Sequence, residues 1–197
     1  MPNPTCASLL LVFATLLLTA ACAQLLLMPV TVPIDAITTV AEDRPLSDAG
    51  TDVRIKVSIL GAFAEQGIGL LVDASADVYQ GQVMLTGSVK KAEDRRMAEE
   101  LASGVKGVRQ IFNEIQVTEE GGIGGAAKDF VIETKLKANL LAAKDVTSIN
   151  YRLRSVNGNV YLLGAARSQG ELDKVLALAR ETDGVRQVVS HVLVKPP

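Results

Sequence analysis

Aromatic residues are scarce in this chain of 197 residues. They make up 4% of it, and tryptophan is absent. Proteins that bind nucleic acid usually stack bases on aromatic side chains and carry an excess of basic residues. The net charge here is −2, so we exclude nucleic acid as a partner.

Side chains suited to catalysis or metal binding are equally few. The two cysteines, Cys6 and Cys22, lie near the N-terminus, and the single histidine is His191. A metal centre or a Cys–His pair needs several such groups in the folded body. The glycine-rich run Gly121–Gly125 lacks the Lys-Ser/Thr pair of a phosphate-binding loop, so we interpret it as a flexible linker. The sequence therefore predicts a protein that is not an enzyme, with no catalytic residue, metal or cofactor.

The N-terminal stretch Met1–Ile34 has no charged side chain. Its apolar core, Leu9–Ala21, is shorter than the roughly 20 residues that cross a bilayer, and it ends in small residues directly before Cys22. This layout resembles the lipobox of bacterial lipoproteins, although Thr19 stands where that family prefers leucine. The resemblance implies a signal peptide over residues 1–21 and a lipidated Cys22. The alternative is an uncleaved membrane anchor, extended by Leu25–Leu27.

Residues 22–51 are expected to form a lipidated tether. Their later part, Glu42–Gly50, is rich in turn formers and acids, which favours an extended or loosely ordered segment. In the lipoprotein family an aspartate after the cysteine commonly retains the protein at the inner membrane. Ala23 stands there instead. The resemblance therefore implies a lipid anchor in the outer membrane, with the folded body facing the periplasm.

The tetrapeptide GVRQ occurs twice, at Gly107–Gln110 and Gly184–Gln187. Shifting the sequence by 77 positions aligns Asp52–Val117 with Asp129–Val194 without a gap, and thirteen of the 66 pairs are identical. Such self-similarity indicates an internal duplication. We predict two small domains, 52–117 and 129–194, joined by a linker over residues 118–128.

Each copy predicts the same order of elements. A first helix (Asp52–Ala64 or Asp129–Ala142) has an apolar residue every fourth position, and a second helix covers Ala92–Ser103 or Gln169–Thr182. Two strands joined at Gln80-Gly81-Gln82, or at Asn157-Gly158-Asn159, lie between them, and a third strand follows GVRQ. Gly87 and Gly164 interrupt a strand where a bulge or a close backbone approach is expected. The fold class is α+β: two tandem α-β-β-α-β modules, each a three-stranded sheet packed by two helices.

This pattern resembles the BON domain, a small module of bacterial envelope proteins. The positions that carry the resemblance in the first copy are Val83, Leu85, Gly87, Gly107, Val108, Ile111, Asn113, Ile115 and Val117. The second copy departs from the signature at Ser190, which stands where the first has Asn113. Together with Cys22, the resemblance implies a dual BON-domain lipoprotein of the outer membrane.

The two copies differ in charge and in the surface of their first helix. The first copy carries a net charge of −1 and the second +2. In the second, Val131, Thr134, Ala138 and Leu141 form an additional stripe beside Lys135 and Lys137. Apolar side chains flanked by lysines suit shallow insertion among anionic headgroups. The alternative is that this stripe packs against the first domain or a second protomer.

The BON resemblance favours the membrane interpretation. Dual-BON lipoproteins are associated with anionic phospholipid binding through the second domain's first helix and the preceding loop. This implies lipid-binding roles for Gly124, Val131, Thr134, Lys135, Lys137 and Leu141. The family can place a large aromatic at the Val131 position; Phe130 lies about 100° round the helix from it, so we do not expect Phe130 to substitute.

We therefore expect a non-catalytic lipoprotein that binds an anionic phospholipid membrane and supports envelope integrity. The alternative is a periplasmic adaptor or chaperone-like module that binds envelope assembly proteins.

Overall fold

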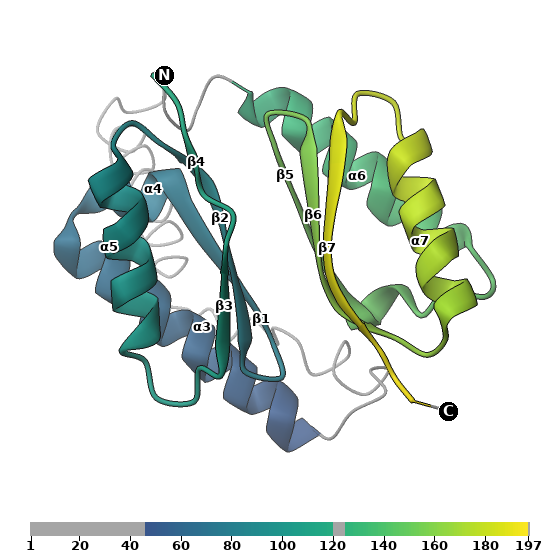
Figure 1. Ribbon diagram of the computed structural model, residues 1–197, viewed down its shortest axis with the longest axis horizontal. Helices are drawn as coiled ribbons and strands as arrows, with labels where there is room; N and C mark the ends of the chain where they lie inside the picture. The colour runs from purple at the N-terminus through teal and green to yellow at the C-terminus, as the bar shows by residue number, and fades with distance from the viewer. Residues whose placement is uncertain (1–45, 120–124, 197) are drawn as a thin grey trace, which may run out of the picture. The chain divides into compact units, whose positions relative to one another are not determined.

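The computed structural model describes residues 46–119 and 125–196 (Figure 1). The expected signal peptide, Cys22, most of the tether and Gly124 lie outside these residues. Both repeats fall within one compact unit, Ile37–Pro197. Across the described ranges, no helix combines the length and apolar character needed to cross a bilayer.

The first module is a mixed sheet covered on one face by helices (Figure 1). The strand β2 lies in the middle, antiparallel to β1 and parallel to β3 and β4. Its elements are α3 (Leu46–Gln66), α4 (Ile68–Asp73), β1 (Ala74–Tyr79), β2 (Gln82–Val89), α5 (Ala92–Ser103), β3 (Gln110–Asn113) and β4 (Gln116–Val117).

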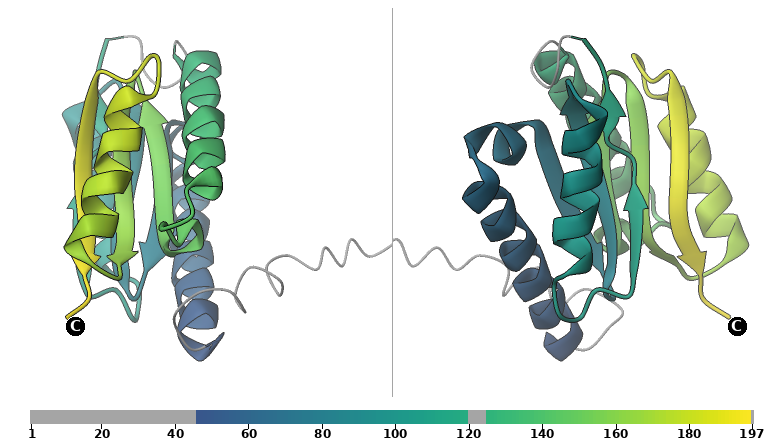
Figure 2. Two further views of the ribbon diagram at one scale, coloured as in Figure 1. Left: turned by 90° about the vertical axis from the view of Figure 1, so that its right-hand side faces the viewer. Right: turned by 60° about the vertical axis from the view of Figure 1, so that its left-hand side comes forward.

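The second module repeats this arrangement with strand order β5-β6-β7. Figure 2 shows α6 and α7 side by side over one face of its sheet. Its elements are α6 (Ala126–Ala142), η1 (Ser148–Asn150), β5 (Tyr151–Val156), β6 (Asn159–Ala166), α7 (Gln169–Glu181) and β7 (Gln187–Val194). The predicted α+β class and the α-β-β-α-β order are confirmed.

Both first helices start earlier than expected. The helix α3 begins at Leu46, so the last six residues of the expected tether are helical, and α6 begins at Ala126, inside the expected linker. The acid in the first turn of α3 is Asp48, not Asp52. Asp52 instead accepts hydrogen bonds from the backbone N–H groups of Gln80 and Gly81, at 2.7 and 2.9 Å.

The last strand of the first module is split, which the repeat did not predict. Asn113 ends β3, because its side-chain amide donates to the Arg95 carbonyl at 3.1 Å while its Oδ1 accepts from the Ile115 N–H at 3.3 Å. In the second module Ser190 stands at this position, and β7 runs unbroken from Gln187 to Val194. The departure noted from sequence therefore marks a continuous edge strand.

The two hairpins have the predicted turn. Asn157 and Gly158 both have positive φ, 53° and 80°, as an N-G hairpin turn requires. The expected close approach at Gly164 is also confirmed: a Cβ there would lie 2.0 Å from the Asn150 carbonyl oxygen. The strand β6 nevertheless continues through Gly164, as β2 does through Gly87, so neither glycine breaks its strand.

Each module has its own hydrophobic core between helices and sheet. The predicted core stripes are confirmed, with all six residues at most 4% exposed: Ile55, Ile59 and Phe63 in α3, and Ile132, Leu136 and Leu140 in α6. A third buried cluster draws on both modules and comprises Tyr79, Met84, Tyr161, Leu163 and Ala165. The two modules therefore share a buried apolar contact made by their sheets.

Charged side chains surround this shared contact. Arg154 donates from Nε to Asp77 Oδ2 at 2.6 Å, and Lys56 lies 2.9 Å from Asp77 Oδ1. His191 is part-buried, 2.9 Å from Glu114 and stacked on Phe112 with ring centroids 3.9 Å apart. The single histidine thus belongs to the junction of the two modules.

Candidate functional site

The helix α6 turns one face to the sheet and the opposite face to solvent. Ile132, Leu136 and Leu140 occupy the buried face. On the other face Phe130 is 70% exposed and Leu141 is 75% exposed. Eleven residues separate these two positions, which is about three helical turns, so they project within about 20° of each other. The described part of the first module covers neither side chain, which contradicts the alternative that the stripe packs against it.

The predicted site residues hold different positions on this face. Val131 is exposed but lies about 80° from Leu141 around the helix. Thr134 lies between Phe130 and Leu141, and its hydroxyl donates to the Phe130 carbonyl oxygen at 2.8 Å. Phe130 lies about 100° from Val131, but it aligns with Leu141 and adds an exposed aromatic ring to this face.

Of the lysines of α6, Lys137 lies within about 40° of Phe130 and Leu141, whereas Lys128 and Lys135 lie about 120–160° from them around the helix. Acids neutralise two of the three. Lys135 lies 3.0 Å from Asp183, and Lys137 lies 3.6 Å from Glu133 one turn earlier. Lys128 is exposed near the N-terminal end of α6, and no ion pair to it occurs among the described residues. The nearest unneutralised cation to Phe130 on this helix is thus Lys128, which sequence reasoning did not single out.

An open cavity of about 620 Å³ lies beside the first turns of α6. Its lining includes Lys128, Val131 and Lys135 from the helix and Arg186 directly before β7, together with two acids, Asp129 and Asp183, so the lining side chains carry one net positive charge. An arginine occupies this position in both GVRQ copies. Sequence reasoning therefore assigned it to the fold rather than to a binding site. Val131 therefore faces this basic cavity instead of the Phe130–Leu141 stripe.

Asp129 builds the floor of this region. Its carboxylate accepts hydrogen bonds from the N–H groups of Asn157 and Gly158, both at 2.8 Å, and from the Ser155 hydroxyl at 2.6 Å. Asp129 is buried, and these donors satisfy its charge within the fold. The hairpin turn is thereby fixed against α6 beside the cavity.

No cluster of three or more His, Cys, Asp or Glu side chains suited to a metal ion occurs in the described ranges. His191 and Glu114 are engaged with each other at the module junction. The exposed features of the second module are therefore an apolar stripe and a basic cavity, an arrangement suited to an amphipathic, anionic surface.

Proteins of several bacteria are similar to this chain in sequence. A protein from Anaplasma centrale, "Uncharacterized protein in gshII 5'region", is 36% identical over 128 residues, covering 64% of this chain and 85% of that protein. "Osmotically-inducible protein Y" of Escherichia coli strain K12 is 29% identical over 146 residues, 73% of each chain. "Outer membrane lipoprotein DolP" of Haemophilus influenzae is 30% identical over 111 residues, covering 56% of this chain and 57% of the relative.

The family assignment rests on both repeats. Residues 51–119 and 128–196 each match the BON domain, and these two segments contain the duplicated units and the sheets described above. The chain therefore belongs to the BON domain family and carries two BON domains in tandem.

Proposed function

We propose that this chain is a non-catalytic protein of the bacterial envelope whose second BON domain binds anionic phospholipid through α6. The observation that carries the proposal is the exposed alignment of Phe130 with Leu141 on a helix that also carries Lys128, Lys135 and Lys137. An aromatic ring and a leucine on one face can enter the headgroup boundary while lysines remain among the phosphates.

The energetic balance favours reversible surface contact. Two exposed apolar side chains would contribute a few kcal/mol if buried, at about 1.5–3 kcal/mol each. A lysine near an anionic surface adds about 1 kcal/mol. The basic cavity that contains Lys128 and Arg186 would receive the headgroup phosphate. Contributions of this size give weak membrane binding, which suits a protein that is also attached to the membrane by a second means.

That second means is the lipid anchor that we propose at Cys22. The H. influenzae relative is named an outer membrane lipoprotein, which supports the same anchoring and location here, with the BON domains facing the periplasm. One acyl chain alone holds a protein only marginally, whereas an acyl anchor combined with a basic surface holds it stably. Anchor and α6 would together keep the body close to the inner leaflet and support envelope integrity.

Co-sedimentation of the unit Ile37–Pro197 with liposomes tests the lipid site. Vesicles rich in phosphatidylglycerol are compared with neutral phosphatidylcholine vesicles. Binding is expected only to the anionic vesicles, and Phe130→Ser or Leu141→Ser should abolish it, while Val131→Ser weakens it less. The matched control is Val53→Ser, because Val53 is the exposed duplicate of Phe130 in α3. Equal binding to both vesicles, or equal loss with Val53→Ser, would reject α6 as the lipid site.

A further inference from the structure

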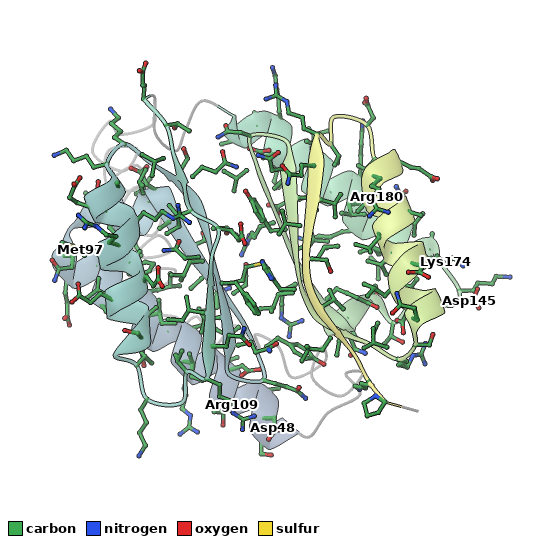
Figure 3. The ribbon with its side chains drawn as sticks, viewed as in Figure 1. Asp48, Met97, Arg109, Asp145, Lys174 and Arg180 are labelled. Atoms are coloured by element: carbon green, nitrogen blue, oxygen red, sulfur yellow. The ribbon has the colours of Figure 1, made fainter. Side chains whose placement is uncertain are left out.

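Two duplicated positions differ sharply between the modules. In the second module Lys174 of α7 donates to Asp145 at 2.9 Å, and the two side chains lie together on the outer side of the helices (Figure 3). The same positions in the first module hold Met97 and Ile68. Met97 is 39% exposed and Ile68 is 80% exposed. An ion pair on one module is thus replaced by exposed apolar side chains on the other.

Met97 lines a groove between α3 and α5, which we call the α3–α5 groove. Its volume is about 510 Å³, and its lining includes Ala62, Met97, Leu101 and Val105. Gln66, the last residue of α3, also lines it. The short helix α4 begins two residues later at Ile68 and extends the exposed apolar surface away from the groove.

The α4 surface has no equivalent in the second module. Within α4, Val72 is 61% exposed on the same side as Ile68, one helical turn away. The duplicated segment of the second module contains Asp145 and ends in the 3-10 turn Ser148–Asn150, and its one large apolar side chain before that turn, Val146, is buried. Isolated exposed apolar residues are ordinary, but a continuous apolar surface marks an interaction site.

The charge around the groove differs from that around α6. The helices α3, α4 and α5 carry eight acidic and four basic residues, a net charge of −4, whereas α6 and α7 carry five of each. Glu100 lines the groove, Glu65 stands next to the last residue of α3, and Asp73 is the last residue of α4. An acidic rim opposes an anionic membrane and favours a partner with basic side chains.

We propose that the α3–α5 groove and the exposed face of α4 dock an amphipathic helix of a protein partner, with lysines or arginines on either side of its apolar face. A groove between two helices accepts a third helix through apolar anchors at i, i+3, i+4 and i+7. Met97 adapts its shape to such anchors. The acidic rim pairs with the partner's basic residues. This site lies on the first module and does not depend on lipid binding by α6.

Fluorescence anisotropy with a synthetic amphipathic peptide tests the proposal. The peptide carries a leucine face and lysine flanks, and its control carries glutamate flanks. The unit Ile37–Pro197 should bind the lysine peptide at least tenfold more tightly than the glutamate peptide. The deciding variant is Ile68→Asp combined with Met97→Lys, which rebuilds on the first module the ion pair of the second. It is expected to remain folded and to lose at least tenfold in affinity, whereas Leu193→Ser, at an exposed apolar residue of β7, should have no effect.

Other outcomes overturn the proposal. Failure to bind the lysine peptide, or equal binding by the double variant, means that the groove is not a helix-docking site. Loss of sedimentation with phosphatidylglycerol vesicles in the double variant means that the surface contacts membrane. Self-association that the double variant abolishes means that a second copy covers it. Phe130→Ser should leave peptide affinity unchanged, so the failure of lipid binding and the failure of peptide docking remain distinguishable.

Discussion

Asp77 and Arg154 are duplicates of one ancestral position, and they bind each other: the Arg154 Nε–H donates to Asp77 Oδ2 at 2.6 Å across 77 residues. Glu114 and His191 are also 77 positions apart and lie 2.9 Å from each other. When equivalent residues of two related units meet, the units are related by an approximate two-fold axis that passes near those residues. The junction between the BON domains is therefore an isologous interface within one chain.

The charges at this interface have diverged in opposite directions. Lys56 approaches Asp77 to 2.9 Å, and its duplicate Glu133 approaches Arg154 to 3.9 Å. These four residues form what we call the charge row, in which each member has a duplicate of opposite charge. Two first domains facing each other would bring Asp77 against its own copy, and two second domains would do the same with Arg154. The row therefore favours pairing of unlike domains, a use of charge for specificity.

Removing one partner of the Asp77–Arg154 pair, the central pair of this interface, should lower the free energy of unfolding markedly. Asp77 is buried, so Asp77→Ala leaves the Arg154 guanidinium without its main counter-charge and should lower the free energy of unfolding by on the order of 3 kcal/mol. Replacing both, Asp77→Leu with Arg154→Met, should cost much less because no charge remains to be desolvated. Urea unfolding of the three chains measures this. Equal losses for the single and double variants would show that the pair acts through packing alone.

Separately expressed domains should recognise each other. Residues 46–119 and 125–196 each contain a complete sheet and core, and mixing them is expected to give a one-to-one heterodimer by analytical ultracentrifugation. Each domain alone should remain monomeric, since self-pairing sets Asp77 or Arg154 against itself. In Asp77→Arg first domains this preference should disappear, because an arginine would then face Arg154. Homodimers of the unaltered domains would contradict the assigned role of the charge row.

The central pair also predicts an acid dependence. Burial tends to raise the pKa of Asp77, but Arg154 and Lys56 outweigh it and hold the pKa below the usual value of 3.8. A carboxyl with a lower pKa in the folded state stabilises the protein above its unfolded pKa, and this contribution is lost as the pH falls through the folded pKa. The stability difference between the wild type and Asp77→Asn should therefore be constant from pH 7 to about 5 and shrink below about 4. Urea titrations at several pH values measure it, and a difference unchanged at pH 3 would show that Asp77 does not titrate in this way.

Replacement of a glycine by alanine should lower stability at two strand positions and raise it at one helix position. Gly164 has φ of +148°, and a Cβ there would lie 2.0 Å from a backbone oxygen, so Gly164→Ala should lower stability by about 3 kcal/mol or more. Gly87→Ala should behave alike, since a Cβ at Gly87 would lie 2.0 Å from the Asp73 carbonyl oxygen. The matched control is Gly61→Ala in the interior of α3. A Cβ at Gly61 meets nothing within 4 Å, and the change should raise stability by up to about 1 kcal/mol. Thermal unfolding followed by circular dichroism separates these outcomes; a neutral Gly164→Ala would show that the backbone can yield there.

Sequence periodicity was enough to predict the order of elements, because each local signal acts within a few residues. The stripe Ile132, Leu136, Leu140 and the Asn157-Gly158 turn specify a helix face and a hairpin without tertiary information. The start of α3 was missed because the acid nearest the expected boundary, Asp52, binds a hairpin turn rather than its own helix. That partner lies 28 residues away, so no local pattern reveals it.

The candidate site was only partly predictable for the same reason. The face of α6 that meets the sheet follows from its apolar period, but which remaining side chains stay uncovered depends on the other domain. Phe130 is uncovered, whereas His191, an equally reasonable surface residue from sequence, is stacked on Phe112 of the first domain. Contacts between the duplicated units arise from three-dimensional pairing, and the repeat itself reveals only which residues are equivalent.

Lysines on α6 should contribute unequally to anionic lipid binding. Lys135 and Lys137 lie 3.0 and 3.6 Å from acidic partners, Asp183 and Glu133, so each lysine–acid pair as a whole adds no net charge to the surface. Lys128 is exposed and lines the basic cavity. Because one lysine near an anionic surface contributes about 1 kcal/mol, Lys128→Gln should weaken binding to phosphatidylglycerol vesicles about fivefold.

The matched controls each remove a whole ion pair: Lys135→Gln with Asp183→Asn, and Lys137→Gln with Glu133→Gln. Each should weaken binding by less than about twofold, because a neutral pair adds no net charge to the surface. Vesicle titrations at low and high salt measure all three affinities, and the Lys128→Gln effect should shrink as salt screens the surface. If removal of the Lys137–Glu133 pair is the most damaging change, the membrane contact lies at the C-terminal half of α6 near Leu141. If Lys128→Gln is, the headgroups enter the cavity beside the first turn, where Arg186 completes the basic lining.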